Sequence, residues 1–394
     1  MVRALRAFAD GYVSLLLPLY LIALGLTPLQ VGVIATATLL GSGMLTLWIG
    51  HHAFRFRYRT LLLAATALMA ATGFAFAIVR DFWPLLLIAT IGTLNPSSGD
   101  VSIFLPLEQA LLARLASARA RTSIFARYSL VGALAGACGA LFAGFPEMLH
   151  DVAHIETLTA LKGMFAFYGA LGLVAALVYR RLPPAAGVET EAQSAPLHRS
   201  KRIVYTLAAL FSLDSFGSGF IVQSLLALWL FQRFQLSIAV AGTIFFWTGT
   251  VSALSYLAAV RIANRFGLIN TMVFTHLPSS ALLIAVAFAP DLGWAIVLLL
   301  LRSALSQMDV PTRNSYVMAV VSPGERAAAA SVTAVAKSLS SSIGPLFAGY
   351  LLGASTFGWP LVIGGSIKIV YDLLLLATFR SVRPPEEAPV RSER

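Results

Sequence analysis

The chain has few charged residues and a single cysteine. Of its 394 residues, 11% are Asp, Glu, Lys or Arg and 58% are hydrophobic. So small a polar fraction cannot cover the surface of a soluble globular protein, which excludes a soluble fold. Because Cys138 is the only cysteine, a disulfide within the chain and a multi-thiol metal site are excluded as well.

Common enzyme motifs are also missing. We find no Walker loop, dinucleotide fingerprint, zinc-protease helix or Ser-His-Asp order. We therefore expect no enzymatic activity, no cofactor and no metal site. Four side chains at helical spacing in a predicted outer loop could bind a divalent metal, but a charged, solvated loop explains them equally well: Glu147, His150, Asp151 and His154.

The hydrophobic residues form twelve stretches of about 19 to 30 residues, each long enough to cross the roughly 30 Å hydrocarbon layer as a helix. A barrel strand needs only about 10 alternating residues, so these lengths indicate helices. The expected spans are 4–25, 29–50, 60–79, 83–112, 122–145, 157–180, 203–231, 237–259, 270–288, 292–320, 327–354 and 358–380. The sequence predicts an all-α integral membrane protein with halves 1–180 and 203–380, a polar linker at 181–202, and a disordered tail at 381–394.

The basic residues predict the orientation. Net charge is +11, yet the bases are not gathered on one surface with exposed aromatics, which argues against nucleic acid as a partner. If both termini are cytoplasmic, most of the 28 Lys and Arg residues fall on the inner side, and Arg80, Lys162 and Arg233 fall outside. We expect a multi-pass protein of a bacterial inner membrane that acts as a monomer.

An internal repeat links the two halves. Residues 121–144 align without a gap with 326–349, and both segments end in Leu-Phe-Ala-Gly. At the same offset, Glu108 aligns with Arg313. Repeats of this size in an apolar chain indicate a transporter with its site at the repeat interface. Four glycines of the first copy form a small-residue face for close helix packing: Gly132, Gly136, Gly139 and Gly144.

Six plus six helices, a central cytoplasmic linker and a repeat in each half resemble the major facilitator superfamily over essentially the whole chain. Its Gly-x-x-x-Asp-Arg-x-Gly signature is similar to Asn264-Arg265-Phe266-Gly267 and, less closely, to the segment around Arg55, although both segments lack the Asp. The resemblance implies cytoplasmic gate roles for Arg55 and Arg265. An intramembrane arginine and a Gly-Pro pair typical of that family occur here at Arg302 and at Gly344-Pro345.

The resemblance also implies that helices 1, 4, 7 and 10 line a central cavity. An ionised group in a membrane costs roughly 2.5 to 3.5 kcal/mol even on a lenient scale, so polar residues on these helices should face a partner or water. The candidates for substrate binding or proton coupling are Asn95, Asp100, Asp214, Gln223, Trp229, Arg302, Gln307, Asp309 and Arg313, together with Lys337 of helix 11.

Several of these residues have two interpretations. Asp309 and Arg313 are one turn apart, with Arg302 about two turns earlier, and form either a coupling cluster or a permanent structural bridge. Glu108 and Arg313 either close the inner gate across the halves or pair within their own halves.

Acids in the cavity helices could carry protons. The candidates are Asp10, Asp100 and Asp214, for which capping or interhelical hydrogen bonding is the alternative. Lys337 could meet Asp214 or an anionic substrate, or could form a structural pair. Lys368 and Asp372, four residues apart, are expected to neutralise each other.

The expected function is alternating-access transport of a small organic or amphipathic solute, with proton-coupled export as the first choice. Uptake or exchange of an organic anion, attracted by Arg302, Arg313 and Lys337, is the second. A non-transporting membrane sensor or assembly partner is the alternative of another class.

Overall fold

The structure is a computed structural model. It describes residues 1–52, 56–97, 104, 107–108, 111–112, 118–181, 197–198, 200–322 and 325–380. The side chains at 50–52, 118–126, 256, 257, 260, 264 and 327 are likewise outside the description. Two predicted site residues, Arg55 and Asp100, lie outside the described residues, as do the predicted tail and most of the predicted linker.

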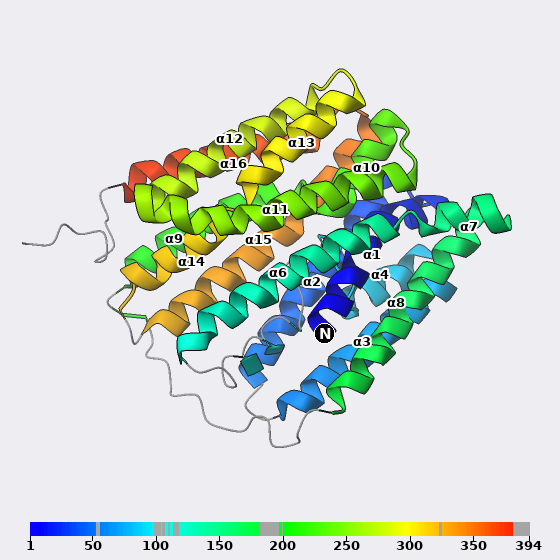
Figure 1. Cartoon of the computed structure of the whole chain (residues 1–394), viewed down its shortest axis with the longest axis horizontal. Coiled ribbons are helices and arrows are strands. Elements are labelled where there is room, and N and C mark those ends of the chain that lie inside the picture. Colours follow the sequence, from blue (N-terminus) through cyan, green and yellow to red (C-terminus); the bar gives the residue numbers. More distant parts are fainter. Residues whose placement is uncertain are drawn as a thin grey trace, which may run out of the picture. The chain divides into compact units, whose positions relative to one another are not determined.

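Helices make up nearly all of the described chain, and its described residues contain no strand (Figure 1). They are α1 (Val2–Ala23), α2 (Pro28–His52), α3 (Tyr58–Ile78), α4 (Phe82–Ile91), α6 (Ala118–Phe142), α7 (Phe145–Ala153), α8 (Thr157–Tyr179), α9 (Lys201–Gly219), α10 (Gln223–Phe234), α11 (Ile238–Phe266), α12 (Leu268–Ala287), α13 (Leu292–Ser306), α14 (Asp309–Val320), α15 (Arg326–Ala354) and α16 (Trp359–Phe379). Ten stretches within the described residues are long and apolar enough to cross a membrane. The all-α membrane fold class is confirmed, while the count of twelve spans stays a prediction.

Three of the predicted spans are interrupted, so the expectation of continuous helices was wrong there. In span 83–112, α4 ends at Ile91 and the described residues 92–97 are not helical, while span 203–231 divides into α9 and α10, and span 292–320 divides into α13 and α14. Pro311, the third residue of α14, has no backbone N–H to donate to the carbonyl of Gln307, which explains the last break. Hydropathy alone did not reveal these breaks because the residues around them are still largely apolar.

A backbone hydrogen bond joins the first two breaks. After α4, Asn95 turns the chain, its Oδ1 accepting hydrogen bonds from the backbone N–H of Ser97 at 3.1 Å and from the Ser97 hydroxyl at 2.7 Å. The main-chain N–H of Ser224, in the first turn of α10, has no partner within its own helix. It donates to the carbonyl of Pro96 at 3.0 Å, which satisfies it.

Close contacts divide the chain into two compact units. Unit 1 comprises Met1–Thr190, Gly219–Thr250 and Ser342–Pro360, and unit 2 comprises Glu191–Ser218, Val251–Ser341 and Leu361–Arg394. These units do not coincide with the predicted halves, whose boundaries stay a prediction.

In unit 1, α1 packs along α6, and α3 packs along α8 (Figure 1). The α1–α6 contact depends on glycine. A Cβ added to Gly139 would lie 2.0 Å from the carbonyl oxygen of Phe8, and one added to Gly11 would lie 2.1 Å from that of Gly136. The predicted close-packing role is therefore confirmed for Gly139, whereas a Cβ added to Gly136 would meet the carbonyl oxygen of Ala7 at an ordinary 3.5 Å.

In unit 2, α12 packs against α13 and α14. The core contains aromatic residues from α9, α14 and α16, with the Phe211 ring meeting Tyr371 and the Tyr316 ring meeting Phe379 edge to face. Charged side chains lie directly beside these rings, and they form the candidate site.

Candidate functional site

Six ionisable side chains meet inside unit 2, and we call them the charge cluster. They come from α9, α12, α14 and α16, and each of these residues is at most 6% exposed. The members are Asp214, His276, Asp309, Arg313, Lys368 and Asp372. Charges buried at membrane depth are expensive unless paired, so their mutual contacts determine what this site can do.

Asp214 of α9 is the centre of the cluster. Its Oδ1 accepts a hydrogen bond from Lys368 Nζ of α16 at 2.8 Å, and its Oδ2 accepts one from Arg313 Nη2 of α14 at 2.9 Å. Lys368 Nζ also donates to the hydroxyl of Ser218 at 2.7 Å. One carboxylate thus connects three helices through two permanent cations.

Arg313 has two carboxylate partners and two aromatic neighbours. Its Nη2 also donates to Oδ2 of Asp309, one turn earlier on α14. The guanidinium carbon lies 5.0 Å from the ring centre of Phe211 and 5.7 Å from that of Tyr371. Asp309 is in the first turn of α14, where a negative charge interacts favourably with the helix dipole.

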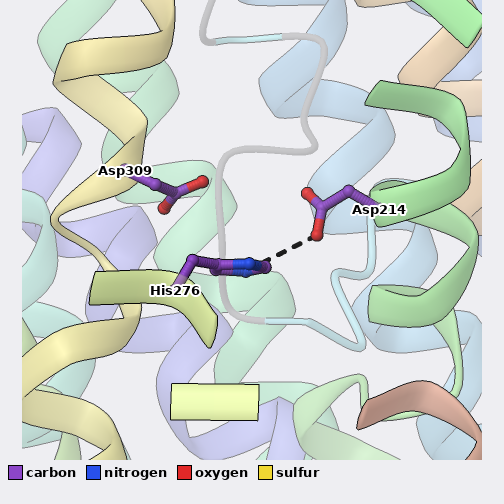
Figure 2. A group of neighbouring side chains, drawn as sticks. All are labelled: Asp214, His276 and Asp309. Atoms are coloured by element: carbon purple, nitrogen blue, oxygen red, sulfur yellow. Dashed lines mark ion pairs between the residues drawn. The ribbon is translucent and has the colours of Figure 1, made fainter. Parts of the chain in front are cut away.

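His276 of α12 lies between two further carboxylates. Its Nδ1 is 3.0 Å from both carboxylate oxygens of Asp372, and its Nε2 is 3.5 Å from Oδ1 of Asp214. The ring also meets Tyr371 edge to face, with centres 5.9 Å apart. Figure 2 shows the imidazole and the carboxyl groups of Asp214 and Asp309 pointing toward one another from three different helices.

Asp214, His276 and Asp309 offer ligand atoms within 4.8 Å of one another, a grouping that could hold a divalent cation (Figure 2). Both oxygens of Asp214 already accept hydrogen bonds from Lys368 and Arg313, and Arg313 also holds Asp309. A metal ion would have to displace an ammonium and a guanidinium group. We therefore interpret the group as an ion-pair network.

A second buried group, which we call the Glu108 group, lies in unit 1. Arg6 Nη2 of α1 donates to Glu108 Oε2 at 2.5 Å, and the hydroxyls of Tyr128 and Tyr179 donate to the same carboxylate. The Arg6 guanidinium also lies 3.9 Å from the ring centre of Phe104. Glu108 thus pairs within unit 1 and Arg313 within unit 2, as the within-half interpretation has it.

Two predictions about which residues lie together were wrong. Lys368 was expected to neutralise Asp372 on the same helix, but it hydrogen-bonds to Asp214 of α9, and Asp372 hydrogen-bonds to His276 of α12. Arg302 was expected to share a helical face with Asp309, but the break at 307–308 separates them. Local spacing predicted only the contact between Asp309 and Arg313.

The other predicted site residues are spread over both units. Trp229 is buried, and its Nε1–H donates to the carbonyl of Thr356 at 3.2 Å, a structural contact. Gln223 begins α10 and Gln307 follows α13, so each lies at a helix break. Lys337 is half-buried on α15, and Arg265 is exposed at the end of α11.

Arg302 of α13 is half-buried and, unlike Arg6 and Arg313, has no ion-pair partner among the described residues. Its Nε is buried with no hydrogen-bond partner in the described part of the chain, as are the Nε atoms of Arg6 and Arg313. Buried guanidinium groups usually have a carboxylate or carbonyl partner, so this atom leaves an unused donor.

Sequence reasoning missed His276 and Arg6. His276 is the one histidine within an apolar span, and that isolation was a usable signal. Arg6 was counted among the cytoplasmic bases because it lies near the N-terminus, yet it is 2% exposed. Tyr128 and Tyr179 carried no sequence signal, because tyrosine is common in membrane helices.

The sequence of the chain matches a known protein family and a known protein. A family model described as Major Facilitator Superfamily matches residues 1–221 and 206–394. The uncharacterized membrane protein YJR124C of Saccharomyces cerevisiae (strain ATCC 204508 / S288c) is 27% identical over 413 residues, covering 96% of this chain and 92% of that protein.

Solved structures are similar in fold. The nucleoside transporter NupG matches with a TM-score of 0.72 at 14% identity, covering 96% of this chain and 97% of its own. The inward-open xylose transporter XylE from E. coli matches with a TM-score of 0.72 at 14% identity, covering 98% and 96%. The human organic anion transporter MFSD10 (TETRAN) matches with a TM-score of 0.65 at 18% identity, covering 95% and 97%.

Proposed function

This chain belongs to the Major Facilitator Superfamily, and we propose that this membrane transporter couples export of a small organic or amphipathic solute to proton movement. The observation that carries the proposal is the charge cluster of unit 2, in which Asp214 joins Lys368 and Arg313. Transport would proceed by alternating access, without enzymatic chemistry and without a cofactor.

The charge cluster supports ion coupling for an energetic reason. A well-packed apolar group in place of a buried ion pair is often neutral or stabilising by about 1 to 4 kcal/mol, so stability alone does not account for six buried ionisable groups. Groups of this kind inside membrane helices commonly mark ion or proton pathways. The interruption between α13 and α14 supports the same interpretation, because discontinuous helices commonly form transporter sites.

Transport in proteoliposomes tests the proposal. Ethidium, uridine, xylose and benzoate represent an amphipathic cation, a nucleoside, a sugar and an organic anion, each offered with and without an imposed pH gradient. We expect gradient-driven movement of at least one probe, and its loss in Asp214→Asn and Asp309→Asn. Asp151→Asn, which changes an exposed acid of α7, is the matched control.

Two results would contradict a role of the charge cluster in proton coupling. One is unchanged gradient-driven transport and pH dependence in folded Asp214→Asn and Asp309→Asn proteins, singly, together and combined with Asp100→Asn. The other is equal transport by the unaltered protein with and without the gradient. A complete lack of flux for a broad panel would favour a membrane sensor or assembly partner instead.

Organic-anion transport is the second candidate, and Arg302 favours it because its guanidinium group has no carboxylate partner among the described residues, whereas Arg6 and Arg313 have one. A guanidinium group binds a carboxylate through two parallel hydrogen bonds, which lysine cannot reproduce. If this candidate is correct, benzoate transport falls in both Arg302→Gln and Arg302→Lys, while Arg261→Gln, at an exposed site of α11, has no effect. Unchanged benzoate transport in Arg302→Gln would exclude a binding role for this residue.

We also propose that both termini are cytoplasmic, that the membrane is a bacterial inner membrane, and that the protein acts as a monomer. The distribution of basic residues supports the orientation. The Glu108 group and Arg265 remain candidates for the cytoplasmic gate.

A further inference from the structure

The ionised part of the charge cluster contains more acids than permanent cations. Its acids are Asp214, Asp309 and Asp372, and its permanent cations are Arg313 and Lys368. With a neutral imidazole on His276, the six side chains carry one net negative charge. With an imidazolium they carry none, so one proton decides whether the buried group is neutral.

The proton on His276 matters because the charge cluster is buried. The six residues are between 0% and 6% exposed, and they lie in helices of a membrane protein. A net charge in such surroundings is strongly unfavourable unless water reaches it. A cluster closed to water is therefore more stable with no net charge, and the negatively charged form is stabilised when the cluster is open to water.

The contacts of His276 match the protonated ring. Its two nitrogens contact different carboxylates: Nδ1 lies 3.0 Å from Asp372, and Nε2 lies 3.5 Å from Asp214. Only an imidazolium donates from both nitrogens. A neutral ring would turn a lone pair toward one of these carboxylates, which is repulsive. Figure 2 shows the ring directed at Asp214.

Three of the helices packed around His276 present charged or titratable side chains to it. Asp214 comes from α9, Asp309 and Arg313 from α14, and Tyr371 with its helix neighbours Lys368 and Asp372 from α16. On α13, the carbonyl oxygen of Arg302 accepts a hydrogen bond from Ser279, one turn after His276, at 3.4 Å. Of these groups, imidazole has the ordinary titration range closest to neutrality, roughly pH 5 to 8.

The carboxylates divide into two kinds by their partners. Asp214 accepts hydrogen bonds from Lys368 and Arg313, and Asp309 from Arg313, so each of them has a permanent cation as its partner. Asp372 instead hydrogen-bonds to His276. The positive charge beside Asp372 is that of the His276 imidazolium, and it disappears when the ring loses its proton.

We propose that the His276–Asp372 pair carries the coupling proton, while Asp214 and Asp309 remain ionised partners of Lys368 and Arg313. This inference rests on the proposed proton-coupled transport. The proton is taken from water on one side as an N–H bond of the imidazole, and returns to water on the other side when that bond breaks. Its departure leaves one net negative charge and weakens the connection of α12 to α9 or α16, which favours the water-exposed arrangement.

Magnetic resonance of the imidazole tests proton binding without any transport assay. The chain has 6 histidines, and those outside the cluster are replaced by glutamine: His51, His52, His150, His154 and His198. In the purified protein, the ¹⁵N signals of His276 should change from imidazolium to neutral ring between about pH 5 and about pH 9. In Asp372→Asn, the ring should be neutral at the acidic end as well. A ring that keeps one protonation state throughout overturns the proposal.

Charge-changing variants test the count of charges. His276→Gln fixes one negative charge in the cluster, whereas the double variant His276→Gln/Asp372→Asn is neutral. We expect the single variant to unfold at a lower temperature than the original protein and the double variant to recover most of that loss. His198→Gln, an exposed position, is the matched control. A double variant no more stable than His276→Gln contradicts the charge count.

Transport of the panel then separates the two proposals. Using the probe that the unaltered protein moves with the pH gradient, the double variant should lose gradient-driven accumulation and retain measurable exchange. Gradient-driven accumulation in the double variant refutes the inference and leaves proton coupling intact. If the unaltered protein moves no probe with the gradient while His276 titrates, the proposed coupling fails and the proton site stands.

Discussion

Replacing Gly139 with alanine tests the packing that holds α1 in unit 1. The added Cβ would lie 2.0 Å from the carbonyl oxygen of Phe8, 2.8 Å from its carbonyl carbon and 3.0 Å from its Cα. All three are backbone atoms, so no side-chain rotation can relieve the contact. An ordinary contact needs about 3.4 Å, so α1 would have to move by more than about 1 Å.

The expected size of the effect follows from overpacking. Inserting a methyl group into a packed contact costs typically about 1 to 3 kcal/mol, which outweighs the gain of roughly 1 kcal/mol that alanine has over glycine in a helix. We therefore expect Gly139→Ala to lower the apparent unfolding temperature. It should also impair transport, because α1 carries Arg6 of the Glu108 group.

Gly163→Ala is the matched control. Gly163 also lies inside a helix, α8, but a Cβ added there meets nothing within 4 Å. This variant should be as stable as the original protein or slightly more stable. Tryptophan fluorescence during heating in detergent measures both, at one fixed scan rate because membrane proteins often unfold irreversibly. Equal unfolding temperatures for Gly139→Ala and Gly163→Ala would refute the packing argument.

The remaining predictions concern orientation, the gate and the charge cluster. Reporter fusions after Arg202 or at the C-terminus should read as cytoplasmic and one near Asp151 as external, and the reverse would overturn the orientation. If Glu108 and Arg313 form a bridge in one access state, Glu108→Arg and Arg313→Glu each impair transport and the double exchange restores part of it, whereas no rescue argues against the bridge. Lys368→Met should lower stability by about 3 to 5 kcal/mol, because it removes one of the two permanent cations that pair with Asp214 and leaves an excess buried negative charge, and an unchanged unfolding temperature would contradict the pairing.

Composition and local spacing predicted the features that depend on neighbouring residues. The hydrophobic content excluded a soluble fold, the apolar lengths indicated helices, and the repeat with its motifs identified the family. The contact between Asp309 and Arg313 followed from the helical repeat, because residues four apart always share a helix face. The Gly139 contact followed from the same periodicity.

Other features depended on contacts that no local pattern encodes. Lys368 was expected to pair with Asp372 because they are one turn apart, but each is bound to a different helix. The charge of a side chain is visible in the sequence, whereas its partner depends on which helices pack together. The helix breaks escaped notice because hydropathy averages over the few residues that form them.

The sequence by itself determined that this chain crosses a membrane, that it is built from a repeat and that ionisable groups lie within its helices. Only the tertiary structure decided that Asp214 and Asp309 pair with Lys368 and Arg313, and that His276 lies between Asp214 and Asp372. The physical reason is the separation along the sequence over which each kind of interaction acts. Hydrophobic partition and helical periodicity act over a few residues, while the neutralisation of buried charge acts between helices that are distant in sequence.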